Sequence, residues 1–137
     1  RSDIFKTIKS MQPKSVTIFL DACYSGQTRE QDMILADARP ITLVYEEDSV
    51  PEDFTVFSAS SGSEISGSLP EADHGLFSYF LMKGLEGDAD ENSDKKITIG
   101  ELHNYVYSHV TRQAIRLGRE QTPQLQGDED RVLVEFN

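Results

Sequence analysis

The amino-acid sequence predicts an α/β fold, and three features of the chain support this assignment. Two segments, Val16–Leu20 and Phe54–Phe57, are almost entirely apolar or β-branched, as expected for strands of a sheet that is covered on both faces. Segments with apolar residues at helical spacing lie before and after these strands. The resulting order is helix, strand, strand, helix, helix and strand, without repeats, which is typical of an α/β layout.

The first elements are a short helix and a strand. Asp3 is expected to cap a helix that Pro13 brings to an end. Its apolar residues at helical spacing are Ile4, Phe5, Ile8 and Met11. The strand Val16–Leu20 follows this helix. Residues 27–38 are polar and without a strong period, which predicts a loop or an irregular helix, whereas Ile41–Tyr45 has the composition of a strand.

The second half of the chain predicts two helices and a final strand. The first helix covers the apolar segment Leu76–Leu85, and Gly87 is placed to end it. The second helix begins near Ile99 and ends at Gly118. Its buried face is expected to carry Leu102, Val106, Val110 and Ala114. The alternating segment Arg131–Phe136 predicts the last strand.

Length and composition limit the classes of function. A chain of 137 residues is expected to form one domain or part of a larger one. It contains no apolar run of membrane-spanning length, and the segment that starts at Arg1 has no hydrophobic region of the kind found in signal peptides. The net charge of −11 argues against nucleic-acid binding and favours basic peptides or divalent metal as partners, although solubility alone also explains it. The single cysteine excludes an internal disulfide and predicts a cytoplasmic location.

That cysteine, Cys23, is a candidate nucleophile. It lies in the segment Asp21-Ala22-Cys23-Tyr24-Ser25-Gly26, which follows the strand Val16–Leu20 directly. In open α/β sheets, ligands gather at the carboxyl ends of the strands, so the thiol is expected at such a position. Cysteine chemistry also needs a base or a positive dipole that lowers the pKa of the thiol. The alternative is that Cys23 is a small buried hydrophobic residue.

The segment around Cys23 resembles the active-cysteine motif of the caspase-like superfamily, especially bacterial caspase homologues and metacaspases. Three further segments are similar to bacterial members in the same order: Phe54–Ser60, His74–Phe77 and Gly118–Gln124. The resemblance implies the C-terminal part, residues 1–137, of a three-layer α-β-α sandwich with a mostly parallel sheet. It also implies a bacterial protein of regulated proteolysis, such as defence or cell death.

The resemblance further implies a cysteine endopeptidase that uses a Cys–His dyad. Cys23 matches the nucleophile, and its thiolate would form an acyl-enzyme with the substrate. Asp21 matches the acid at the floor of the S1 pocket, which implies protein or peptide substrates that are cleaved after Arg or Lys. Ser58 and Ser60 are expected to line the substrate groove. The alternative for Asp21 is a carboxylate that caps a neighbouring turn.

The general base is missing from the expected place. In this family the catalytic histidine precedes the cysteine strand, but none of the 22 residues before Cys23 is histidine. His74 matches a second His-Gly motif of bacterial members and is expected to be a cap or surface residue, and His103 and His109 are expected to be solvated. A companion chain or upstream segment is therefore the favoured source of the histidine. A truncated chain or an inactive enzyme remains the alternative.

A second candidate site is an acidic segment that resembles an EF-hand loop. Asp90, Asn92 and Asp94 fall at loop positions 1, 3 and 5, Lys96 is placed to supply a backbone carbonyl, and Glu101 falls at position 12. Lys95 occupies the position that normally holds glycine and must therefore adopt a left-handed conformation. Calcium would be structural or activating, and the peptidase chemistry itself needs no cofactor. The alternative is a helix connector whose acids are only solvated.

Two other functions compete with the peptidase. In the first alternative, the chain is a catalytically inactive caspase-like scaffold that acts through protein–protein interaction. In the second, it is a calcium-responsive binding module in which Cys23 is incidental. Labelling of Cys23 by a peptidyl-arginine reagent distinguishes the enzyme from both alternatives.

Overall fold

The computed structural model describes residues 2–21, 50–61 and 75–137. The predictions made for residues 27–38 and 41–45 fall outside these ranges. In chain order the elements are α1 (Ser2–Ser10), β1 (Val16–Leu20), β2 (Phe54–Ser58), α2 (Leu76–Lys83), the π-helical turn η2 (Gly84–Asp88), β3 (Lys96–Thr98), α3 (Ile99–Arg116), β4 (Gln124–Gln126) and β5 (Val132–Glu135).

The main sheet of the described residues has the strand order β1-β2-β4. β1 and β2 are parallel, as expected for two fully apolar strands, and their register runs from the pair Val16–Phe54 to the pair Leu20–Ser58. β4 runs antiparallel to β2, so the described strands form a mixed sheet. All five residues of β2 are buried, because β2 is the central strand of the three. β1 is only half-buried, and Phe19 is 37% exposed.

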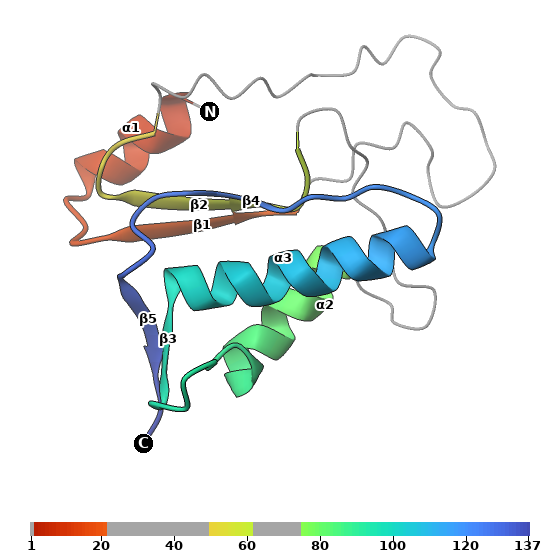
Figure 1. Cartoon of the computed structure of the whole chain (residues 1–137). Helices are drawn as coiled ribbons and strands as arrows, with labels where there is room; N and C mark the ends of the chain where they lie inside the picture. Colours follow the sequence, from red (N-terminus) through yellow and green to blue (C-terminus); the bar gives the residue numbers. More distant parts are fainter. Residues whose placement is uncertain (1, 22–49, 62–74) are drawn as a thin grey trace, which may run out of the picture.

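Helices cover both faces of this sheet, as Figure 1 shows: α1 lies on one face, and α2 and α3 lie on the other. Successive side chains of β2 point to opposite faces. The ring of Phe54 meets Phe5 of α1 edge to face, with centroids 5.5 Å apart. Phe57 belongs to the core that α2 and α3 form with the sheet. The sequence-based prediction of an α/β fold is therefore confirmed.

The longest helix, α3, is held by an apolar stripe and a cap. Its predicted core positions are all fully buried: Leu102, Val106, Val110 and Ala114. The Thr98 side chain accepts a hydrogen bond from the Glu101 backbone, and the Glu101 side chain accepts one from the Thr98 backbone. This reciprocal arrangement, the capping box, satisfies two donors at the start of the helix. The helix therefore begins at Ile99, as the sequence predicts.

Several details differ from the sequence-based predictions. α1 begins at Ser2, so Asp3 lies in its first turn and not at its cap. The apolar segment after Gly75 is α-helical only as far as Lys83 and continues as η2, where Gly87 has φ 132°. Gly87 thus adopts a backbone conformation that other residues rarely reach, consistent with its predicted role in ending the helix.

The C-terminal strand β5 pairs with β3 in a separate two-stranded sheet. Arg131, just before β5, connects this unit to the main sheet. Its Nη2 donates to the hydroxyls of Thr17, at 2.5 Å, and Thr55, at 3.1 Å, on neighbouring strands. Of the helices in the described part of the chain, none has both the length and the hydropathy to cross a membrane.

Candidate functional site

Asp21 lies where the sequence predicts it, directly after β1 at the carboxyl edge of the sheet. Its side chain is exposed, and its Oδ2 accepts a hydrogen bond from the Ser78 hydroxyl of α2. Gly75 makes room for this carboxylate, because a Cβ at that position would lie 2.7 Å from Asp21 Oδ2. The start of α2 and the end of β1 therefore fix the position of one negative charge at the sheet edge.

Ser58 and Ser60 lie beside this edge, at the carboxyl end of β2. Ser58 is paired with Leu20, and the Ala59 N–H donates to the Leu20 carbonyl at 2.9 Å. The Ser58 side chain is only 7% exposed, and its hydroxyl donates to the Ser60 carbonyl at 3.5 Å. Ser60 is half-buried. The structure thus brings the ends of β1 and β2 together, as the sequence predicts, with Ser60 the more accessible of the two serines.

Cys23 and His74 lie outside the described residues. Their proposed roles, as nucleophile and as a cap or surface residue, therefore stay predictions. Cys23 follows Asp21 by two positions in the sequence.

The two histidines of α3 are not simply solvated, contrary to the sequence-based prediction. His103 is half-buried, 6.4 Å from the Phe57 ring between centroids, and its Nε2 lies 3.4 Å from the Pro123 carbonyl oxygen. His109 stacks on Phe80 with centroids 5.0 Å apart. Both rings contact aromatic side chains from elements that are distant in the sequence, and such contacts leave no local pattern on the helix.

Tyr105 contacts His109 from one turn earlier in α3, with ring centroids 4.3 Å apart. Burial raises the pKa of the Tyr105 hydroxyl above its ordinary value, and the Asp88 carboxylate, which accepts its hydrogen bond at 3.3 Å, raises it further. Tyr105 therefore stays protonated to a higher pH than an exposed tyrosine and links α3 to η2.

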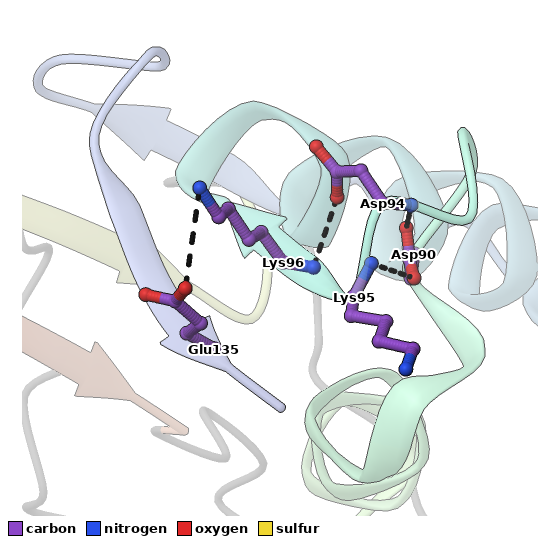
Figure 2. A network of polar contacts seen from close by, with 5 residues as sticks. All are labelled: Asp90, Asp94, Lys95, Lys96 and Glu135. Carbon is purple, nitrogen blue, oxygen red and sulfur yellow. Dashed lines mark hydrogen bonds and ion pairs between the residues drawn. The ribbon is translucent and has the colours of Figure 1, made fainter. Parts of the chain in front are cut away.

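In the acidic loop that follows η2, side-chain oxygens accept hydrogen bonds from backbone N–H groups of the same loop (Figure 2). Asp90 accepts from the Asp94 N–H at 3.2 Å and from the Lys95 N–H at 3.0 Å. Asn92 accepts from the Asp94 N–H at 3.0 Å, and Asp94 accepts from the Lys96 N–H at 2.9 Å. The side chains of the first three predicted calcium ligands therefore all accept hydrogen bonds from one backbone segment, residues 94–96.

One predicted ligand of this loop, the Glu101 carboxylate, has other partners, whereas Lys96, whose backbone carbonyl is the predicted ligand, forms its ion pair through its side chain. The Glu101 carboxylate accepts from the Thr98 N–H at 2.9 Å and from the Thr98 hydroxyl at 3.2 Å, within the capping box. The Lys96 ammonium approaches Glu135 of β5 at 4.0 Å (Figure 2), an exposed ion pair of little energetic weight. Within residues 2–21, 50–61 and 75–137, no three His, Cys, Asp or Glu side chains are grouped to hold a metal ion.

Lys95 has φ 64°, the left-handed conformation that its position in the loop predicts. A residue with a Cβ loses about 1–2 kcal/mol in this conformation, whereas glycine adopts it readily. Lys95→Gly is therefore expected to raise the free energy of unfolding by about 0.5–1 kcal/mol, measured by urea denaturation. Lys96→Gly is the matched control in the extended strand β3 and is expected to lower it. A loss of stability in Lys95→Gly would contradict this explanation.

One buried polar residue was not recognised from the sequence. Gln121 is 1% exposed, and its Nε2 donates at 2.9 Å to the carbonyl of Ala59, the residue between Ser58 and Ser60. It lies within the segment Gly118–Gln124, whose similarity to bacterial caspase homologues was the available signal. The contact joins residues 62 positions apart, so spacing along the chain does not reveal it.

Comparison with known proteins gives one match. The family model described as the caspase domain matches residues 2–133. Neither a curated protein nor a solved structure matches the chain.

Proposed function

Because the chain belongs to the caspase family of cysteine peptidases, we propose that it is the part of an endopeptidase that cleaves after Arg or Lys. The Cys23 thiolate attacks the scissile carbonyl carbon, a C–S bond forms, and the peptide C–N bond breaks. A histidine of the companion segment gives the leaving amine its proton, and water then hydrolyses the acyl-enzyme.

The position of Asp21 is the observation that carries this proposal. Its exposed carboxylate lies at the carboxyl edge of the parallel pair β1–β2, where α/β sheets bind their ligands. The Ser78 hydroxyl and the space at Gly75 hold the charge in place before a substrate arrives. A fixed carboxylate binds a guanidinium or ammonium group through charge-assisted hydrogen bonds. This supports a basic residue on the amino side of the cleaved bond.

The proposed source of the catalytic histidine is an upstream segment or companion chain that packs along the outer side of β1. β1 has five residues with the composition of a fully covered strand, yet it is only half-buried, and Phe19 is 37% exposed. β2, one strand further in, is buried throughout. The difference between these neighbours supports another strand beside β1, which would bring its own side chains to the same carboxyl edge.

A panel of fluorogenic peptides tests the proposal on the full protein, together with any chain that co-purifies with it. Peptides with Arg or Lys at P1 are expected to be cleaved, and peptides with Asp at P1 are not. Citrulline, which has the shape of arginine without its charge, is the matched substrate control. Cleavage after Asp, or equal cleavage after Arg and citrulline, would contradict the assigned specificity. An absence of all cleavage would favour the inactive scaffold.

Calcium binding by the loop Asp90–Glu101 is a separate proposal. It is supported by the hydrogen bonds of Asp90, Asn92 and Asp94 and by the left-handed Lys95. Binding requires the Glu101 carboxylate to leave the capping box, so we expect a weak dissociation constant of about 10⁻⁴ M or above.

Calorimetric titration with Ca²⁺ tests this second proposal. Asp90→Ala is expected to remove the heat of binding, while Asp128→Ala is expected to keep it. Asp128 is a suitable control because it is an exposed acid in another turn, where its Oδ1 accepts from the Asp130 N–H. No heat in the unmodified protein, or the same heat in Asp90→Ala, would exclude calcium binding at the loop.

A further inference from the structure

The backbone pairing of β2 and β4 ends just before the substrate edge of the sheet. The last pair on that side joins Ser58 to Gln124. Beyond it, the Ala59 carbonyl accepts a hydrogen bond from a side chain, the Nε2 of Gln121, at 2.9 Å. Gln121, which precedes β4 in the chain, therefore continues the bonding of β2 by one residue beyond its last pair with β4.

The other side of Ala59 is bonded to β1. The Ala59 N–H donates to the carbonyl of Leu20, the last residue of β1, at 2.9 Å. Ala59 is thus held on both sides, by β1 through its N–H and by Gln121 through its carbonyl. Ala59 and Gln121 are 2% and 1% exposed, so water does not replace either bond easily.

The segment that carries Gln121 is itself fixed. Pro123 is fully buried, and its carbonyl oxygen lies 3.4 Å from Nε2 of His103 on α3. His103 packs in turn near Phe57 of β2, with ring centroids 6.4 Å apart. Gln121 therefore extends from a segment anchored to α3 to the peptide group that joins the ends of β1 and β2.

We infer that Gln121 is a positioning residue, which acts through Ala59 to set the spacing between Asp21 and the Ser58–Ser60 end of β2. The inference rests on the proposed function, in which these two strand ends bind the substrate. Without the amide donor, the buried Ala59 carbonyl lacks its Gln121 hydrogen bond, and the end of β2 shifts relative to β1. Peptide binding is then expected to weaken more than the chemical step.

Two substitutions in the full protein test the inference. Gln121→Met keeps the side-chain length but removes the donor. It is expected to raise KM for a P1-Arg peptide about tenfold, with kcat changed less than about threefold, and to speed hydrogen exchange of the Ala59 amide about tenfold or more. Gln124→Met is the matched control and is expected to change none of these values. Its exposed side chain donates to Thr122, in its own segment.

Gln121→Glu adds a pH signature that a general packing defect would not produce. Burial raises the pKa of a carboxyl group, so at about pH 5 the neutral acid donates to Ala59, whereas at about pH 8 the carboxylate faces the carbonyl without a donor. Relative to the unmodified protein at the same pH, KM is expected to recover as the pH falls. This variant also serves as the test if Gln121→Met does not fold.

The two readouts separate this inference from the proposed function. If the unmodified protein cleaves peptides but KM is unchanged in Gln121→Met and independent of pH in Gln121→Glu, the positioning role is overturned. If the unmodified protein cleaves nothing, the proposed function fails, and hydrogen exchange still decides about the contact. Unchanged exchange at Ala59 in Gln121→Met, or in Gln121→Glu at the higher pH, would overturn the inference in either case.

Discussion

Cys23→Ala is expected to remove all measurable cleavage of P1-Arg peptides, a loss of about 10⁴-fold or more in kcat. The thiolate forms the covalent bond of the acyl-enzyme, and no other cysteine exists in the chain to replace it. Loss of the nucleophile of a protease leaves only binding and oxyanion stabilisation, which act weakly without it. The measurement is kcat/KM at equal protein concentration.

The control for this variant is to show that its stability and its peptide binding are unchanged. Cys23→Ala is expected to unfold at the temperature of the unmodified protein and to bind a P1-Arg peptide with similar affinity, because binding depends on Asp21 and not on the thiol. A variant that keeps activity within tenfold of the unmodified protein would show that Cys23 is not the nucleophile.

Asp21→Asn is expected to lower kcat/KM for P1-Arg peptides about 100-fold, while cleavage of the P1-citrulline peptide changes little. A bound peptide would shield the exposed Asp21 carboxylate from water, and removal of one partner of such a shielded charge pair costs about 2–5 kcal/mol, so loss of the carboxylate charge dominates the change. The asparagine side chain has nearly the same shape, and its oxygen still accepts from Ser78. The specificity ratio between the Arg and citrulline peptides is therefore the quantity to measure.

Gly75→Ala tests the same charge without altering it. The added Cβ would lie 2.7 Å from Asp21 Oδ2 and must displace the carboxylate. Discrimination between the Arg and citrulline peptides is expected to fall, but less than in Asp21→Asn, because the charge remains nearby. Full discrimination in Asp21→Asn would refute the assignment of Asp21 to the S1 pocket.

Elements with a strong local pattern were predicted well. β1 matches the predicted strand residue for residue, and α3 buries the predicted apolar stripe, because strand and helix periods are visible within a few residues. β3 and β4 were not predicted as strands. Each has three residues, and their strand structure depends on β5 and β2, which lie elsewhere in the chain.

For the site, the place of Asp21 in the fold was predictable from its place in the sequence, whereas the roles of Asp21, Cys23, Ser58 and Ser60 stay predictions. Asp21 could be placed at the carboxyl edge of the sheet, because a residue that directly follows a strand lies at the end of that strand. The prediction that His103 and His109 are solvated was wrong, because their aromatic neighbours Phe57 and Phe80 come from other elements. The contact of Gln121 with Ala59 was missed for the same reason. Contacts between side chains that are distant in the sequence can be identified only once the fold is known.

The most direct test is covalent labelling by a peptidyl-arginine chloromethylketone, with the adduct located by mass spectrometry of the full protein and any companion chain. A single adduct on Cys23, prevented by competing P1-Arg peptide and greatly slowed in Asp21→Asn, is the result we predict. An absence of labelling at Cys23 with the companion chain present would contradict a peptidase in which this chain supplies both the nucleophile and the acid of the S1 pocket.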